Sequence, residues 1–278
     1  MESLEPSLCC IGTRVRRLTS AEVVRSACDV FARGHDMPVA ASPMQDDEYD
    51  DDDTLELSTP FLASIHRLAT LCGAALVDSH RESLASLSAE EVELRRFIET
   101  YIQRAYRRPL TAADRQRFLE LFTVTRRHES FARSLATLVQ TALVSAPFLF
   151  RTELGESVST RGVTHLTGHE IATALAYFVW GTTPGPELMD AAENGALREP
   201  KGLTHFASVM LDDERRAQRI HEASDDVHLL RMAFGRHATG ELELDPVTDE
   251  KLGTANDNRE AALAIITSPL FVLRKTSA

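Results

Sequence analysis

The chain has few cysteine and aromatic residues. Its 278 residues include four cysteines, one tryptophan and 6% aromatic residues. The cysteines form no CxxC pair, no zinc-ribbon spacing and no CxxCH haem-attachment motif. The longest nearly unbroken apolar run, Ile171 to Trp180, has about half the length that a helix needs to cross a bilayer. The sequence therefore predicts no transmembrane segment and no cofactor, with a metal ion as the one alternative left open.

Positive charge is also scarce. Thirty basic residues face 42 acidic ones, which gives a net charge of −12. Because a net-acidic protein is repelled by phosphate backbones, we expect no nucleic-acid partner. The segment 35–57 holds two prolines and a cluster of seven acids, and like charges this close together repel one another in any compact form, so we interpret it as a disordered linker. The seven acids are Asp46, Asp47, Glu48, Asp50, Asp51, Asp52 and Asp53.

Several catalytic signatures are missing. The sequence contains no G-x-S-x-G elbow, no GxGxxG loop and no GxxxxGK[ST] phosphate loop. These absences remove the local support for a hydrolase or a nucleotide-dependent enzyme. The first residues also lack the basic start and apolar core of a signal peptide, so the chain as written is expected in the cytoplasm.

What the sequence does have is helical periodicity and helix caps. Apolar residues make up 43% of the chain, enough for a sizeable core. We expect helical structure from Arg14 onward, capping boxes at Thr19, Ser88, Thr111 and Thr167, and further helix starts at Pro186, Thr204 and Ser224. The one weak strand candidate is Glu241 to Leu244. The fold class is predicted to be all-α, a multi-helix bundle.

Two distant parts of the chain resemble each other. Residues 105–111 and 233–239 share the pattern A-[YF]-x-R-x-x-T, and residues 145–151 and 268–274 share S-x-x-F-x-[FL]-R. The same order at similar spacing indicates a duplicated helical unit. We therefore divide the chain into an N-terminal helical module (12–34), the linker (35–57) and a helical body (58–278). The body holds a first copy (88–153), central helices (164–220) and a second copy (224–275), and we predict that the copies pack as one body across the apolar helix at 171–180.

Two groups of polar residues are candidate sites. His221, Asp225 and His228 are spaced i, i+4 and i+7, so one helix through them would present three ligands suited to zinc or iron. The alternative is a solvated helix face. The one cluster of basic residues consists of Arg104, Arg107 and Arg108, which could contact an anion or a partner. The alternative for them is a structural role, because arginines near a helix end neutralise its exposed carbonyls.

The motifs at 104–111 (RAYRRPLT), 143–153 (LVSAPFLFRTE) and 169–188 (HEIATALAYFVWGTTPGPEL) resemble the planctomycete-type helical proteins built from serial domains of unknown function, in particular those numbered 1595 and 1592. Residues 14–31 are similar to the 1587-type start, and residues 233–239 with 266–274 to the 1585-type end. The resemblance covers about three quarters of the chain. It implies a helical fold and no established catalytic residues.

The chain departs from this family in ways that mark it as a compact, divergent member. It has no CxxCH, it has Ala174, Ala176 and Gly185 where the family favours other residues around Tyr177 and Trp180, and its segment before Ala233 is short. The resemblance implies export. If the start of this sequence is placed too late and an in-frame export signal lies upstream, the protein belongs to the cell envelope. We expect a non-enzymatic helical module that binds a partner protein or a ligand in an envelope-associated assembly. The alternative is a redox or metal-dependent enzyme component of a cytochrome-type system.

Overall fold

The protein is described by a computed structural model. The structure describes residues 12–32, 57–79, 90–156, 162–213, 217–221, 223–234 and 244–275. The chain divides into two compact units, Arg17–Phe150 and a second unit that combines Met1–Arg16 with Arg151–Ala278. We call them the 17–150 unit and the 151–278 unit and describe each by itself. The predicted acidic linker, as well as Cys9 and Cys10, lies outside the described residues.

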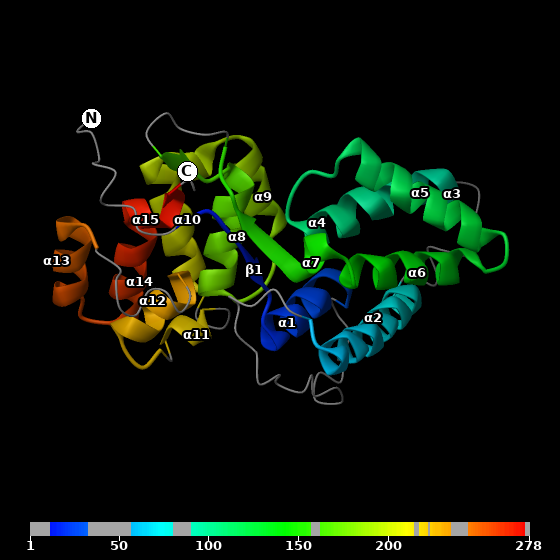
Figure 1. The fold of residues 1–278 in the computed structure, drawn as a ribbon, viewed down its shortest axis with the longest axis horizontal. Helices are drawn as coiled ribbons and strands as arrows, with labels where there is room; N and C mark the ends of the chain where they lie inside the picture. Colours follow the sequence, from blue (N-terminus) through cyan, green and yellow to red (C-terminus); the bar gives the residue numbers. More distant parts are fainter. Residues whose placement is uncertain are drawn as a thin grey trace. The chain divides into compact units, whose positions relative to one another are not determined.

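The 17–150 unit consists of helices. In chain order they are α1 (Ser20–Phe31), α2 (Thr59–Ser79), α3 (Glu90–Phe97), a π-helical turn (Ile98–Ile102), α4 (Gln103–Tyr106), α5 (Ala112–Arg126), α6 (Phe131–Leu143) and the short α7 (Ala146–Leu149). Helix α2 lies along α6 and also contacts α1, while α5 also packs against α6 (Figure 1). Their shared core is built from one stripe of each helix, including Phe61 and Ile65 of α2 and Leu138 of α6.

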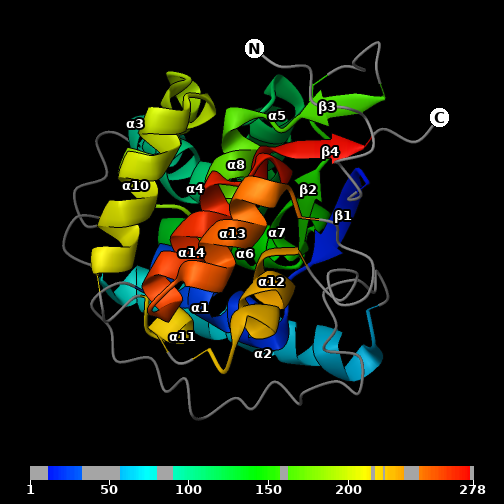
Figure 2. The same ribbon diagram turned by 90° about the vertical axis from the view of Figure 1, so that its left-hand side faces the viewer.

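The 151–278 unit combines helices with two small sheets. Its helices are α8 (Gly168–Val179), α9 (Pro186–Glu193), a 3-10 turn (Ala196–Arg198), α10 (Pro200–Asp212), α11 (Gln218–His221), α12 (Asp226–Phe234), α13 (Pro246–Thr254), α14 (Asn258–Thr267) and α15 (Pro269–Val272). Strands β1 (Arg14–Arg17) and β2 (Phe150–Glu153) form one sheet. Strands β3 (Val163–His165) and β4 (Leu273–Lys275) form the other, antiparallel, with Thr164 opposite Arg274 (Figure 2).

Residues just before β1 join the second sheet. Gly12 forms a parallel bridge with Lys275, and the amide of Thr13 donates to the carbonyl of Lys275 at 2.9 Å. The segment that begins at Gly12 therefore pairs with β4 first and with β2 a few residues later. Helical structure was predicted from Arg14 onward, and this was wrong for residues 14–17, because the alternating pattern Arg-Val-Arg-Arg forms a strand whose last two residues are buried.

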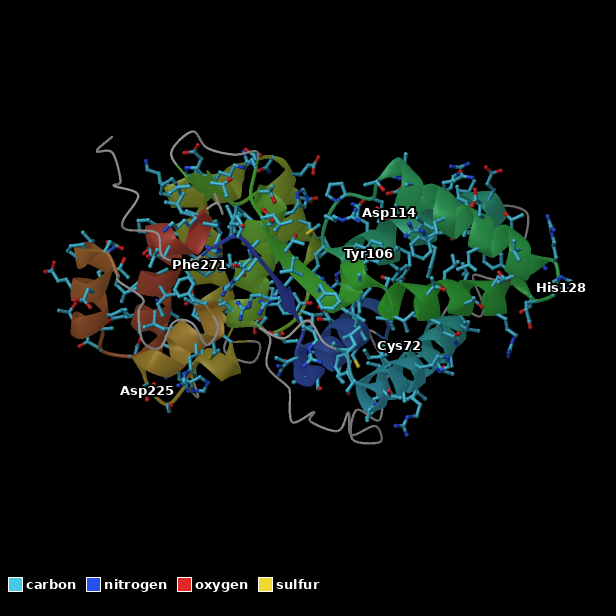
Figure 3. All side chains as sticks on the ribbon, in the orientation of Figure 1. Cys72, Tyr106, Asp114, His128, Asp225 and Phe271 are labelled. Atoms are coloured by element: carbon cyan, nitrogen blue, oxygen red, sulfur yellow. The ribbon has the colours of Figure 1, made fainter. Side chains whose placement is uncertain are left out.

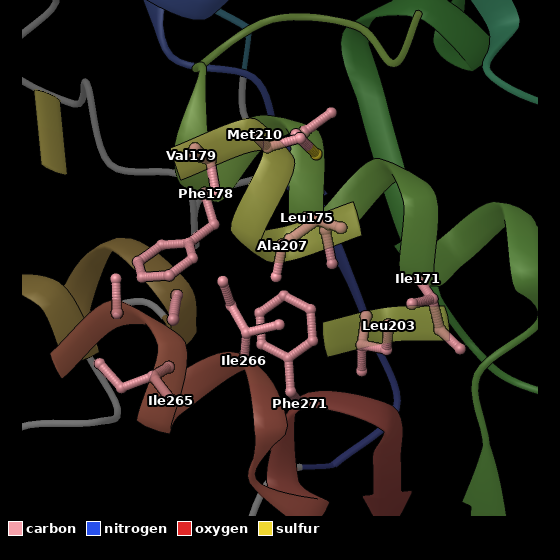
Figure 4. Close-up of a cluster of buried hydrophobic side chains, with 14 of the residues drawn as sticks. Ile171, Leu175, Phe178, Val179, Leu203, Ala207, Met210, Ile265, Ile266 and Phe271 are labelled. Carbon is pink, nitrogen blue, oxygen red and sulfur yellow. The ribbon is translucent and has the colours of Figure 1, made fainter. Parts of the chain in front are cut away.

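Helix α8 is the centre of the 151–278 core, as its apolar sequence predicted. Leu175 and Val179 are fully buried, and Phe178 is 1% exposed. Helices α9, α10 and α12 contact α8, and the ring of Phe271 from α15 lies 6.2 Å from that of Phe178, centroid to centroid. Figure 4 shows Ile266 and Phe271 among the side chains of α8 and α10. The all-α fold class is confirmed, since only short strand pairs accompany the helices in the described ranges.

The two similar sequence segments also have the same order of elements. In the first, α4 is followed by α5, α6, the one-turn helix α7 and strand β2. In the second, α12 is followed by α13, α14, the one-turn helix α15 and strand β4. The one-turn helices start from matching residues, because Ser145 precedes α7 and Ser268 precedes α15. This repeated order supports the predicted duplication, although residues 235–243 of the second segment are outside the described part.

The predicted helix boundaries agree with the structure except at a few points. Three of the four predicted capping boxes are present, at Thr19, Thr111 and Thr167, each with its side chain accepting from the third helical amide. The box at Ser88 lies outside the described residues. Thr204 does not start a helix, because α10 already begins at Pro200 and the Thr204 hydroxyl donates to the Pro200 carbonyl. Of the weak strand candidate at 241–244 only Leu244 is described, and it is not in a strand.

One helix meets the length and composition of a membrane span, which the search for an unbroken apolar run missed. It is Thr59–Val77 of α2, with a mean hydropathy of 1.4. The core helix of a soluble protein passes the same test, and 44% of this segment is buried inside the protein. The expectation of no transmembrane segment therefore stays a prediction.

Candidate functional site

The most concentrated group of charges in the described structure surrounds Glu153, the last residue of β2. Its carboxylate accepts one hydrogen bond from Nε of Arg274 at 2.7 Å and another from Nε of Arg14 at 2.9 Å. Nη1 of Arg16 lies 3.7 Å from the other carboxylate oxygen. The side chains of Glu153, Arg16 and Arg274 are at most 3% exposed. One carboxylate thus binds three arginines that are more than a hundred residues away in sequence on either side.

The same arginines bind the carbonyl groups at two helix ends. Arg14 donates to the carbonyl of Phe234 and Arg16 to that of Ala233, both in the last turn of α12. Arg274 donates to the carbonyls of Leu270 and Leu273, each at 2.7 Å. The last carbonyls of a helix carry a partial negative charge and have no intrahelical partner. The helix ends therefore supply part of the negative charge that a single carboxylate cannot provide for three guanidinium groups.

Electrostatics fix the ionisation state of Glu153. Burial on its own would raise the pKa of this carboxyl, but the charges of Arg274, Arg14 and Arg16 outweigh burial and hold the pKa far below its ordinary value. Glu153 is consequently ionised at physiological pH and has no proton to give. The ion pairs and hydrogen bonds of this cluster hold β1, β2, β4 and the end of α12 together. This is a structural role, different from that of an acid or base toward a substrate.

The three arginines predicted to form an anion or partner contact are engaged within the 17–150 unit. Arg104 pairs with the carboxylate of Asp29 at 2.7 Å, and Arg108 pairs with that of Asp114 at 2.8 Å. Arg107 is 3% exposed and donates to four backbone carbonyls, those of Ala105, Pro147, Phe148 and Phe150. This geometry is the structural role that the sequence left as the alternative.

The predicted metal ligands do not share a helix. His221 is the last residue of α11, Asp225 precedes α12, and His228 lies in the first turn of α12 (Asp225 is labelled in Figure 3). The chain breaks its helix here because the Asp225 side chain accepts from the His228 amide at 2.7 Å and so caps a new helix. Among the described residues, no group of three histidine, cysteine or acidic side chains is placed to hold a metal ion. The continuous helical face on which that prediction depended is not formed.

Sequence reasoning did not single out Glu153. Two signals were present: Arg14 and Arg16 alternate as residues on one face of a strand do, and Arg274 ends the second S-x-x-F-x-[FL]-R motif. Neither signal identifies the shared partner, because the contacts join residues separated by 121 and 139 positions.

The two family matches fall on the helical segments described above. Residues 93–153 match the family described as PSD5, protein of unknown function (DUF1595), and residues 166–241 match PSD4, protein of unknown function (DUF1592). The two matched segments, called the PSD5 region and the PSD4 region below, follow one another in the chain. The PSD5 region ends at Glu153 itself, while Arg14, Arg16 and Arg274 lie outside both regions. Neither a curated protein nor a solved structure matches the chain.

The order of the two regions confirms the resemblance to the 1595 and 1592 domains. The 1587-type start and the 1585-type end stay predictions. Because both matched families are of unknown function, the matches give no activity, and the activity has to be argued from the molecule.

Proposed function

We propose that this PSD5–PSD4 protein is a helical binding module, and that the outward face of α2 receives a partner protein. The observation that carries this proposal is the composition of that face. Between Thr59 and Val77, where the burial of each side chain is described, nine residues are exposed and only Arg67 among them bears a permanent charge; the others are Thr59, Pro60, Leu62, Ala63, His66, Thr70, Leu71 and Ala74.

The opposite face of α2 is apolar because it packs into the core of the 17–150 unit. Phe61, Ile65 and Cys72 are at most 1% exposed and face α1 and α6. A surface helix of a globular protein usually places charged residues on its outer side. Helix α2 instead leaves Leu62 and Leu71 about two fifths exposed, at 41% and 38%. An outward face with so little charge favours an additional covering element, and exposed apolar side chains rimmed by polar residues are typical of protein interaction sites.

The partner would meet a long, shallow helical surface with small residues at its centre. Ala63 and Ala74 lie between Leu62 and Leu71 around the helix, so another helix could approach closely there. The envelope-associated setting is a separate part of the proposal. It is supported by the family resemblance alone.

Site-specific crosslinking in the native host tests the surface. A photoreactive residue at Ala63 or Ala74 is expected to give one discrete protein adduct, and Ala74→Glu is expected to weaken that adduct when the crosslinker is at Ala63. A photoreactive residue at Val124, which is 57% exposed on α5, is the matched control and should give no such adduct. Equal adduct patterns at all positions, or none at α2, would contradict the proposal.

Fractionation of the same cells tests the setting. An envelope-associated protein is recovered with the membrane or periplasmic fraction, and recovery of the full amount with cytosolic markers would refute that part. The two tests are independent, because a cytosolic protein could still bind a partner through α2.

A further inference from the structure

We propose that Cys28 of α1 and Cys72 of α2 are a thiol pair that a disulfide-bearing oxidant converts into one intramolecular disulfide. Such a bond would tie α1 to α2 and close a loop around the intervening chain, which includes the acid-rich segment. The proposal is independent of the partner surface above, since it concerns the interface between α1 and α2.

The helix packing provides the geometry. Helices α1 and α2 contact each other, and both belong to the 17–150 unit. Cys72 is fully buried and lies on the stripe that also includes Phe61, Ile65 and Leu68. Cys28 is half-buried, and both thiols are free. Figure 3 shows Cys72 on the side of α2 that lies next to α1.

The two sulfurs are also linked electrostatically. Burial raises the pKa of Cys72 to about 12, and a negative charge on Cys28 adds to the shift. The pKa of Cys28 is itself raised by burial and by Asp29. The thiols therefore influence each other's ionisation, and the placement of the pair rests on the contact between α1 and α2.

The reaction balances without a metal or an added electron carrier. With oxidised glutathione, the Cys28 thiolate attacks one sulfur, breaks the glutathione disulfide and releases a glutathione thiolate, which takes up a proton. Cys72 then gives up its proton and its sulfur displaces the second glutathione. Two protein thiols are oxidised to one disulfide, and one glutathione disulfide is reduced to two thiols.

The exposure difference sets the order of these steps. Cys28 is the more accessible thiol and reacts first, whereas Cys72 reacts only within the interface. Because the thiolate is the reactive form and both pKa values lie above the ordinary value, the rate should increase by up to about tenfold for each pH unit above neutrality.

The experiment uses the full chain with Cys9→Ser and Cys10→Ser, so that only the proposed pair remains. After incubation with oxidised glutathione, the intact mass should decrease by two hydrogen atoms, and a digest should contain the Cys28 peptide joined to the Cys72 peptide. The oxidised protein should unfold at a higher temperature than the reduced protein, because the bond restricts the unfolded chain.

Two single variants separate the steps. With Cys72→Ser the reaction should stop at a glutathione adduct on Cys28, and with Cys28→Ser the buried Cys72 should stay a free thiol. If the parent protein also stops at the Cys28 adduct, or if the linked form unfolds at a lower temperature than the reduced form, the native interface does not accommodate the bond and the proposal is wrong.

Discussion

Arg107 and Arg274 bind equivalent parts of the two similar segments. In the first, Arg107 donates to the carbonyls of Pro147 and Phe150, at the start and end of the turn that follows Ser145. In the second, the equivalent carbonyls are those of Leu270 and Leu273, and their donor is Arg274. The sequence explains the exchange, because the residue that aligns with Arg107 is Gly235, which has no side chain.

Arg151, which aligns with Arg274, makes a different contact. Its guanidinium lies over the ring of Tyr177, 5.0 Å from the centroid. A position that binds backbone in one segment thus stacks on an aromatic ring in the other. Duplicated sequence motifs predict equivalent elements, but they do not predict equivalent contacts, since each contact also depends on the residues supplied by neighbouring segments.

Replacing Arg107 tests its role as the donor for the first exit turn. Arg107→Ala should lower the free energy of unfolding by about 2–4 kcal/mol, because four buried carbonyls lose a charged donor. Arg107 also has a φ of 57°, so Arg107→Gly removes the side chain and relieves the backbone at the same time. Denaturant unfolding compares the variants. If Arg107→Gly is as stable as the parent, the backbone conformation rather than the guanidinium determines the residue at this position.

Replacing Glu153 tests the arginine cluster. Glu153→Gln should destabilise the protein by about 3–5 kcal/mol, because three guanidinium groups then lack their shared carboxylate. Glu156→Gln is the matched control, since Glu156 forms an exposed ion pair with Arg198, and exposed pairs contribute about 0–1 kcal/mol. If the two variants lose similar amounts of stability, the buried ion pairs of Glu153 contribute no more to folding than the exposed pair of Glu156.

The same residue predicts an acid dependence. Because the folded-state pKa of Glu153 lies below its ordinary value of 4.5, its contribution to stability is complete above that value and decreases as the pH falls below it. The parent protein should therefore lose stability more steeply than Glu153→Gln between about pH 5 and about pH 3. Parallel stability curves for the two proteins over this range would contradict the assignment.

At the scale of single elements, helix caps were predictable because their signals are local. A threonine followed three residues later by an acid marks the starts of α1, α5 and α8 in the sequence, and the structure has all three boxes. In α8 the box extends further, because the Glu170 carboxylate also accepts from the amides of Leu154 and Gly155. That extension joins segments on either side of β3, and no local pattern predicts it.

Elements that depend on distant contacts were missed. Strand β1 exists because β2 pairs with it, although it directly precedes a capped helix. The π-helical turn at 98–102 lies inside one helical pattern, where the tilted rings of Phe97 and Tyr101 lie 5.1 Å apart, centroid to centroid. Apolar spacing alone does not reveal the extra residue. The same reason applies to Glu153. Its residue type is ordinary, and only the meeting of three segments makes it a site.

Two threonine variants test this distinction between a cap and an interior position. Thr167→Ala should cost about 0.5–2 kcal/mol, because α8 loses the hydroxyl that accepts from the Glu170 amide. Thr204→Ala is the control and should change stability by no more than about 0.5 kcal/mol, since Thr204 is inside α10 and bonds only back to Pro200. Thermal unfolding of both variants provides the comparison, and a larger loss for Thr204→Ala would refute the boundary at Pro200.

At the scale of the whole molecule, the PSD4 region depends on residues that follow it in the chain. Helix α8 is buried on nearly all sides, whereas α14 and α15, which contribute Ile265, Ile266 and Phe271 to the same core, lie beyond the PSD4 match. The predicted packing of the two copies as one body stays a prediction. Within the 151–278 unit, however, the second copy and the central helices share one hydrophobic core.

A chain that ends at Arg219 tests that dependence. It lacks α12 to α15, so α8 and α10 lose the apolar cover that includes Phe234, Ile265 and Phe271. Each large apolar side chain contributes about 1.5–3 kcal/mol when buried, so the loss of several exceeds the margin of about 5–15 kcal/mol that stabilises a typical domain. We expect the truncated protein to aggregate or to unfold without cooperativity, as measured by calorimetry and dye binding. The full chain with Phe271→Leu is the control for a mild core change and should remain soluble and melt cooperatively, with a loss of less than about 1.5 kcal/mol. A soluble truncated protein whose residues 151–219 unfold cooperatively would show that the second copy is a separate domain.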